Sequence, residues 1–153
     1  MDTGECCINM VSEHFAEAAN STSINTPYGI SEWAISGLHP APCTTVKCSR
    51  VKEAVFSVEG KLVETKEFES KVTPGKKTGV LAIIEGTRFW AREDSINEQK
   101  NIIDPAILRP VSRLGGISYG RTLPGFEIPR PDFDEFKKTG DLEGLVKPKV
   151  EGQ

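Results

Sequence analysis

The sequence has little basic excess and no long hydrophobic run. Its formal net charge is −3 at pH 7, whereas a nucleic-acid-binding surface needs a clustered basic face. No apolar run approaches the length of a membrane span. The first residues contain neither the basic region nor the apolar segment of a secretory signal. We therefore expect a cytoplasmic protein that binds neither nucleic acid nor membranes.

Histidine and cysteine are also scarce. The two histidines, His14 and His39, have no nucleophile paired with them in sequence, which gives little support to a histidine-dependent catalytic triad. The four cysteines lack the paired spacing of a zinc site. In the absence of a secretory signal, thiols stay reduced by default. We expect four free thiols and no bound metal; the cysteines are Cys6, Cys7, Cys43 and Cys48.

The chain of 153 residues is long enough for one domain with a hydrophobic core. We expect this domain to span residues 1–136. The remaining residues, 137–153, are charged and contain glycine and proline, as is typical of a flexible C-terminal tail.

Two long segments have the pattern of β-strands. Residues 54–65 alternate between apolar and polar side chains, which predicts a half-buried antiparallel strand. Residues 78–92 contain an apolar run at 80–84, which predicts a strand buried on both faces, and Gly86 indicates a bulge or the close approach of a ligand. Pro74 and Gly75 lie between the two segments, so we expect them to form a hairpin turn.

Shorter elements flank this hairpin. Residues 5–11 resemble a short strand that leads directly into a helix at residues 12–20, with Ser12 as its N-cap. A second helix is expected at residues 31–36, capped by Ser31 and closed by Gly37. A third is expected to begin at Asp104 and Pro105.

The least generic segment is residues 108–122, which contains two adjacent glycines between two arginines. Gly115 and Gly116 can adopt positive φ or approach another group closely. Arg113 and Arg121 can bind phosphate or carboxylate through two hydrogen bonds, and Tyr119 has both an apolar ring and a polar group. Spacing alone favours the other interpretation, a two-glycine turn followed by an ordinary strand.

Six motifs occur in order between Gly4 and Phe133. They are residues 9–13 (NMVSE), 27–33 (PYGISEW), 37–38 (GL), 50–54 (RVKEA), 90–94 (WARED) and 108–119 (LRPVSRLGGISY). Together they resemble the flavin reductase-like, FMN-binding split-barrel family, especially its eukaryotic, fungal-looking members. The resemblance implies a mainly β, antiparallel split barrel with Greek-key connections and short helices. It also implies a homodimer, FMN at the subunit interface, and reduction of flavin by NAD(P)H.

The sequence departs from the family pattern in two ways. Family members have a substantial portion before the segment that corresponds to Thr3–Glu5 here, so we expect an N-terminally abbreviated barrel. The strand that contains Gly86 often has a histidine near its end, where this chain has Trp90.

These departures leave two functional hypotheses open. The first is an FMN-dependent NAD(P)H:flavin oxidoreductase. The second is a flavin-free, diverged or truncated member, acting as a dimerising binding module or as a tailoring enzyme on a hydrophobic small molecule. The tailoring enzyme would use an apolar pocket of Phe89, Trp90 and Tyr119, with Glu93 or Asp94 as the acid–base group.

If FMN binds, three segments are expected to contact this small-molecule ligand. A strand-to-helix corner can offer free N–H groups to a phosphate, hydroxyl groups can donate hydrogen bonds, and an arginine brings a permanent charge. The candidate residues are Asn9, Ser12 and Glu13 at the corner, Ser21 and Thr22 in the following loop, and Arg113, Gly115, Gly116 and Tyr119 in the glycine segment. We expect the homodimer to bury residues 80–84 or their neighbours.

Overall fold

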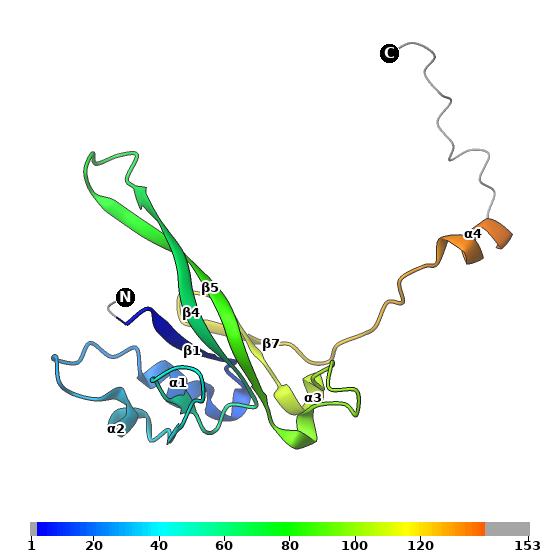
Figure 1. Ribbon diagram of the computed structural model, residues 1–153, viewed down its shortest axis with the longest axis horizontal. Helices are drawn as coiled ribbons and strands as arrows, with labels where there is room; N and C mark the ends of the chain where they lie inside the picture. The colour runs from blue at the N-terminus through cyan, green and yellow to red at the C-terminus, as the bar shows by residue number, and fades with distance from the viewer. Residues whose placement is uncertain (1–2, 140–153) are drawn as a thin grey trace, which may run out of the picture. The chain divides into compact units, whose positions relative to one another are not determined.

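A computed structural model describes residues 3–139 of the chain (Figure 1). The chain divides into two compact units between Leu123 and Pro124. The second unit contains helix α4 (Phe133–Thr139), which begins where Asp132 Oδ1 accepts hydrogen bonds from the N–H groups of Asp134 and Glu135. Most of the predicted tail, residues 140–153, lies outside the described residues.

The main sheet of the first unit is antiparallel and contains β1 (Glu5–Asn9), β4 (Phe56–Glu69) and β5 (Lys77–Ala91) in the order β1-β4-β5. The predicted hairpin is confirmed, because β4 pairs with β5 along almost its whole length. The predicted turn is also confirmed, with Gly75 at φ 77°. Figure 1 shows this hairpin as the long green ribbon.

The bulge predicted near Gly86 is confirmed. Glu59 pairs with Arg88 and Gly60 pairs with Gly86, which leaves Thr87 as the extra residue on β5. Gly60 is needed for close packing here, because a Cβ atom at this position would clash with Cγ2 of Ile84.

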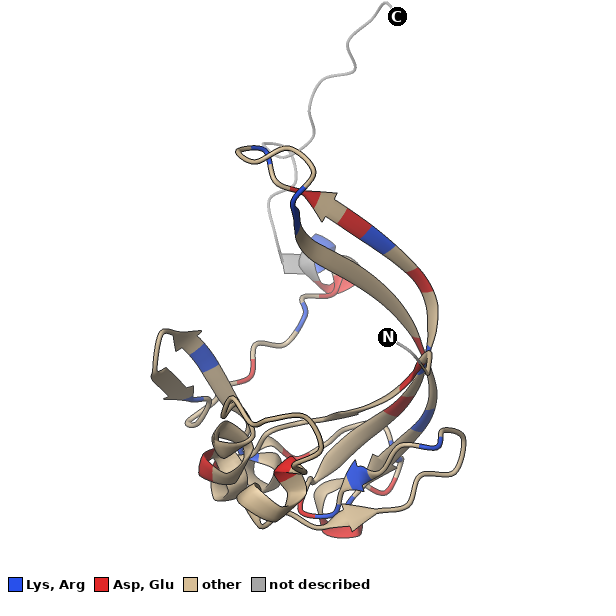
Figure 2. Ribbon diagram, turned by 90° about the vertical axis from the view of Figure 1, so that its left-hand side faces the viewer, with Lys and Arg blue, Asp and Glu red and all other residues tan. Residues whose placement is uncertain are grey.

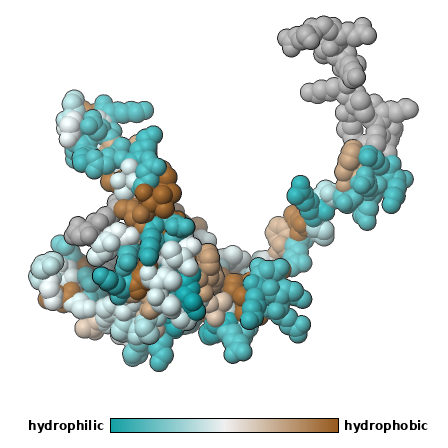
Figure 3. Space-filling view, viewed as in Figure 1, coloured by the Kyte–Doolittle hydropathy of each residue, from teal (hydrophilic) through white to brown (hydrophobic). Residues whose placement is uncertain are grey.

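The prediction that residues 80–84 are buried on both faces is wrong for the single chain. Val80, Leu81, Ile83 and Ile84 are 46%, 52%, 49% and 37% exposed. The reason is that β1 pairs only with residues 57–61 of β4, so the outer part of the hairpin is a two-stranded ribbon. Figure 3 shows hydrophobic side chains gathered on this ribbon, and Figure 2 shows that the charged residues follow β4 rather than this part of β5.

Two small sheets and several short helices complete the first unit. β2 (Pro40–Ala41) pairs with β3 (Arg50–Val51), and β6 (Val111–Gly115) pairs with β7 (Ser118–Arg121). The helices are η1 (Glu13–Phe15), α1 (Ala16–Ser21), α2 (Glu32–Ser36), η2 (Glu93–Ser95) and α3 (Pro105–Leu108), with η denoting a 3₁₀-helix. No helix among residues 3–139 is long and apolar enough to cross a membrane.

The predicted helices are confirmed, but two of their caps are not. Asp104 caps α3 by accepting a hydrogen bond from the N–H group of Ala106, and Gly37 ends α2 at φ 67°. Ser12 and Ser31 occupy N-cap positions without making a side-chain cap bond. Ser12 instead is completely buried, and its hydroxyl has no partner. A serine before a helix predicts the cap position, but burial against another segment can redirect its side chain.

The hydrophobic core lies beneath these helices. Phe15, Leu38 and Ala54 are buried together. Partly buried apolar residues pack around them: Val11, Ala18, Ala19, Trp33 and Val51. The core therefore fixes η1 and α1 against the strands, which positions one side of the cavity described next.

Candidate functional site

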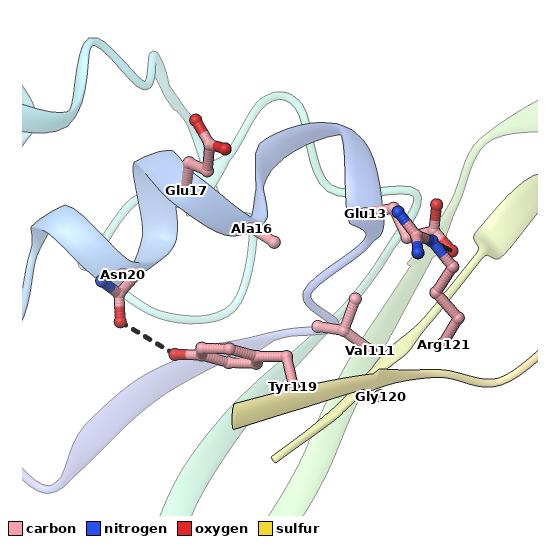
Figure 4. A pocket seen from close by; sticks show the side chains of 8 residues that line it. All are labelled: Glu13, Ala16, Glu17, Asn20, Val111, Tyr119, Gly120 and Arg121. Atoms are coloured by element: carbon pink, nitrogen blue, oxygen red, sulfur yellow. Dashed lines mark hydrogen bonds and ion pairs between the residues drawn. The ribbon is translucent and has the colours of Figure 1, made fainter. Parts of the chain in front are cut away.

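A cavity of about 420 Å³ lies between η1–α1 on one side and the β6–β7 hairpin on the other (Figure 4). It is lined by Glu13, Ala16, Glu17, Asn20, Val111, Tyr119, Gly120 and Arg121. In Figure 4, Ala16, Val111 and the ring of Tyr119 border its apolar part. The ion pair of Glu13 and Arg121 lies at one end, and the hydrogen bond between Tyr119 and Asn20 lies at the other.

Glu13 joins the two sides of the cavity. Its backbone N–H donates to the carbonyl of Arg109 at 2.9 Å, and its carboxylate pairs with the guanidinium of Arg109 at 2.6 Å and with that of Arg121 at 3.4 Å. The hydrogen bond from Arg109 is the main cause that lowers the pKa of Glu13, and the charge of Arg121 adds to it. Arg109 and Arg121 thus neutralise the carboxylate of Glu13, and Glu17 adds a second acidic side chain to the lining of the cavity.

Tyr119 links the glycine hairpin to helix α1. Its hydroxyl accepts a hydrogen bond from Arg113 Nη1 at 2.6 Å and donates one to Asn20 Oδ1 at 2.9 Å. Arg113 also donates to the carbonyl of Gly116 and lies over the Tyr119 ring at 4.8 Å. Arg113 therefore braces the hairpin turn and orients the phenol, and it does not line the cavity itself.

Both glycines of the hairpin turn adopt positive φ, 107° at Gly115 and 53° at Gly116. A Cβ atom at either position would have no neighbour within 4 Å. The two-glycine turn is thus confirmed, and the glycines are required by backbone conformation. Close packing does not explain them in this chain.

The other predicted site residues lie away from the cavity. Asn9 Oδ1 accepts hydrogen bonds from the N–H of Val51 and the hydroxyl of Ser57, which ties β1 to β3 and β4. Ser21 and Thr22 donate their hydroxyl protons to carbonyls of the preceding turn of α1. Together with the buried Ser12, these candidates lie away from the cavity; Arg113, Gly115 and Gly116 do not line it either, so Glu13 and Tyr119 are the predicted site residues in its lining.

Sequence reasoning did not include Asn20 or Arg121 among the ligand contacts. Asn20 could have been found from helix periodicity, because Glu13, Ala16 and Asn20 are spaced three and four residues apart and share one helical face. The sequence does indicate that Arg121 can bind an anion. Tyr119 and Arg121 are two residues apart in β7, so their side chains lie on the same face of this strand. What the sequence could not indicate is that this helical face lies opposite β7.

The structure does not assemble the hydrophobic pocket of the flavin-free hypothesis. Phe89 and Trp90 do not line the cavity that Tyr119 lines. The carboxylate of Asp94 is bound by both Nε and Nη2 of Arg92, at 2.5 and 2.9 Å. An acid held in this way is a poor general base. The four cysteines are free, and no group of three or more metal-binding side chains occurs among the residues described.

Residues 1–108 match the family described as flavin reductase like domain. The chain belongs to this family. Nitrilotriacetate monooxygenase component B from Bacillus cereus has a similar structure, with a TM-score of 0.75 and 27% identity over 83% of this chain and 61% of that chain. The 2-nitrobenzoate 2-nitroreductase NbaA from Pseudomonas fluorescens is also similar, with a TM-score of 0.73 and 27% identity over 86% of this chain and 62% of that chain.

A third structure supports the fold. A split-barrel-domain protein from Shewanella frigidimarina aligns with a TM-score of 0.66 and 23% identity over 86% of this chain and 61% of that chain. The fold is therefore the expected one, mainly β with antiparallel strands of the split-barrel type and short helices. The chain spans about three fifths of the length of the curated relatives that it matches.

Proposed function

We propose that the chain is a flavin reductase-like oxidoreductase that binds FMN in the cavity between α1 and β7 and accepts reducing equivalents from NAD(P)H. The observation that carries the proposal is the composition of this cavity. An apolar slot is flanked at both ends by hydrogen-bonding groups, which suits a planar ring with polar edges. Family membership adds the redox chemistry, and the free thiols agree with a reducing compartment such as the cytoplasm.

The residues present fit a flavin. The volume of about 420 Å³ falls in the usual range of small-molecule sites, roughly 300–1,000 Å³. Ala16 and Val111 offer apolar contact, and Tyr119 offers a ring face. Arg121 suits an anionic group, since its side chain is largely exposed and a guanidinium can donate two parallel hydrogen bonds to a phosphate.

FMN supplies the hydride and electron transfer chemistry when it is bound. The chain's own residues would bind FMN and orient it. Arg121 stabilises negative charge at its end of the cavity, because its guanidinium cannot lose its proton in the physiological range. Asn20 fixes the direction of the Tyr119 hydroxyl by accepting its hydrogen bond.

We also propose that two copies pair through the outer part of the β4–β5 hairpin. A two-stranded ribbon is at best marginally stable alone in water, and this one exposes apolar residues on both faces. A second copy of the same ribbon would offer a matching apolar surface. Light scattering should give the mass of a dimer, and a Val80→Lys/Ile83→Lys variant should give that of a monomer. A Glu98→Lys variant, which changes the charge by the same amount at an exposed position outside the hairpin, controls for the added charge, and a monomeric wild type would contradict the proposal.

Quenching of FMN fluorescence tests the site. Arg121→Gln should weaken binding by about 1.5–3 kcal/mol if the guanidinium bonds the ligand, and Tyr119→Phe by about 0.5–1.5 kcal/mol. Ala16→Leu should block binding by filling the slot. Arg92→Gln is the matched control, because this arginine is paired with Asp94 away from the cavity. Anaerobic bleaching of bound FMN by NADH or NADPH identifies the donor.

Two results would refute the assignment. If the wild type shows no saturable FMN binding, the proposed function is wrong. If it binds and the folded Ala16→Leu and Arg121→Gln variants bind equally well, the flavin lies elsewhere. Circular dichroism of each variant separates a loss of binding from a loss of folding.

A further inference from the structure

Two arginines lie against one tryptophan on the main sheet. The guanidinium carbon of Arg50, from β3, is 4.5 Å from the centroid of the Trp90 ring, and that of Arg88, from β5, is 4.9 Å from it. Arg88 and Trp90 are two residues apart on one strand, so they share a face of the sheet. None of the three residues lines the cavity between α1 and β7.

Neither Arg50 nor Arg88 forms an ion pair with an acidic side chain of the described residues, and the one carboxylate beside them, that of Glu59, is bonded to other groups. Neither side chain forms a hydrogen bond or ion pair within the part of the chain that the structure describes, and Nε of Arg50 is buried without a partner. The remaining arginines of residues 3–123 all have such partners: Arg92, Arg109, Arg113 and Arg121.

The carboxylate that touches Trp90 is already fully engaged. Glu59 is completely buried and accepts hydrogen bonds from Nε1 of Trp90 at 2.6 Å and from the N–H groups of Thr44 and Thr45 at 2.8 and 2.5 Å. The Thr45 hydroxyl adds a fourth bond at 2.6 Å. Glu59 therefore holds the indole in place and carries one negative charge beside two positive ones.

We propose that Arg50 and Arg88, held against Trp90, bind the oxyanion of a phosphate-bearing small molecule. Guanidinium groups match phosphate geometry with paired donors, and two of them suit a group with close to two negative charges. Stacking on the indole fixes both side chains in advance, which lowers the entropy lost on binding. The anion would also relieve the repulsion between two like charges on one ring. This site stands independently of the flavin cavity.

Trp90 itself can report the binding. The chain has two tryptophans, so a Trp33→Phe background leaves Trp90 as the single emitter. Inorganic pyrophosphate, which does not absorb at the excitation wavelength, is titrated at low and constant ionic strength. We expect a saturable change in emission. Arg50→Gln and Arg88→Gln should each weaken binding roughly ten- to hundredfold, the range for loss of a charge-assisted hydrogen bond.

The controls separate a site from a general effect of charge. Arg92→Gln should leave binding unchanged, because this arginine is already paired with Asp94. Arg88→Lys should give an intermediate loss, since lysine keeps the charge and loses the paired donors. If Arg50→Gln fails to fold, the exposed Arg88 tests the site alone. Absence of saturable binding by emission and by equilibrium dialysis, or an equal loss in Arg92→Gln, overturns the proposal.

The source of the phosphate is resolved by comparing probes. Tighter binding of ADP than of pyrophosphate assigns the site to a nucleotide phosphate, and equal or weaker binding assigns it to an inorganic one. FMN binding that survives Arg88→Gln but is lost in Ala16→Leu would locate flavin in the cavity and leave the arginine pair as a second site. Failure of the flavin experiment leaves the pyrophosphate titration unaffected, so the two proposals can fail separately.

Discussion

Replacing Asn9 by alanine should destabilise the fold more than it affects any ligand. The Asn9 Oδ1 atom accepts the N–H of Val51 at 3.0 Å and the hydroxyl of Ser57 at 2.8 Å, and Ser57 is only 1% exposed. The substitution leaves both donors without a partner. Each buried unpaired donor costs about 1–3 kcal/mol, so the free energy of unfolding should fall by about 2–6 kcal/mol.

Urea unfolding followed by circular dichroism measures this change. Asn9→Asp keeps the acceptor oxygens and should recover most of the lost stability. Ser57→Ala removes one of the two donors, so it should cost less in the Asn9→Ala background than in the wild type, by about 1 kcal/mol. A FMN titration of the folded variants measures the ligand effect, which we expect to be small.

Two outcomes would refute the reasoning about Asn9. One is a loss of less than about 0.5 kcal/mol on Asn9→Ala, the usual size for a surface substitution. The other is unchanged stability together with a large loss of FMN affinity. That second outcome would restore Asn9 as the ligand contact that the strand-to-helix corner predicts.

Three further substitutions or treatments test the electrostatics and the backbone. Burial raises the pKa of Glu59, but hydrogen bonds from Thr45, Thr44 and Trp90 outweigh burial and lower the pKa from 4.5 to about 2. The stability that this carboxylate contributes is thus complete above pH 4.5 and is lost as the pH falls towards 2. Glu59→Gln should therefore flatten the fall in Tm between these two pH values. Burial is the main cause that raises the pKa of Cys7 to about 12, and the hydrogen bond with Cys43 is the second. A thiol reagent should therefore label Cys7 slowly in the native protein, whereas all four thiols should react after denaturation without reductant. Gly116→Val should lower the free energy of unfolding by about 1–2 kcal/mol and Gly116→Asn by less, because asparagine tolerates the positive φ better.

The sequence predicts most local structure because local rules decide it. Alternation along residues 54–65 and the Pro74–Gly75 turn were enough to indicate the hairpin, and Asp104 before Pro105 was enough to indicate a capped helix. Burial is different. The apolar run at residues 80–84 looks the same whether its cover comes from this chain or from another, so the pattern alone could not tell that the single chain leaves it exposed.

The site was only partly predictable for a related reason. Glu13, Arg113 and Tyr119 were identified from residue type and from the glycine segment, and they do lie at or beside the cavity. The partner of Tyr119, Asn20, is 99 residues away along the chain. Asn9 was an equally plausible ligand contact by residue type, but its amide oxygen already accepts hydrogen bonds from Val51 and Ser57. Residue type states what a side chain can do, and only the tertiary contacts decide which groups are left free to do it.

The two arginines that pair with Glu13 differ in how free each is to bind a ligand. Arg109 pairs with the carboxylate at 2.6 Å, and its carbonyl accepts the N–H of Glu13, so it connects the two sides of the cavity at two points. Arg121 pairs at 3.4 Å and its side chain is 78% exposed. A weak, exposed ion pair contributes little to stability, so Arg121 can turn to an anionic ligand at small cost while Arg109 keeps the carboxylate neutralised. Substitution of Arg109 should therefore lower the free energy of unfolding, whereas substitution of Arg121 should mainly weaken ligand binding.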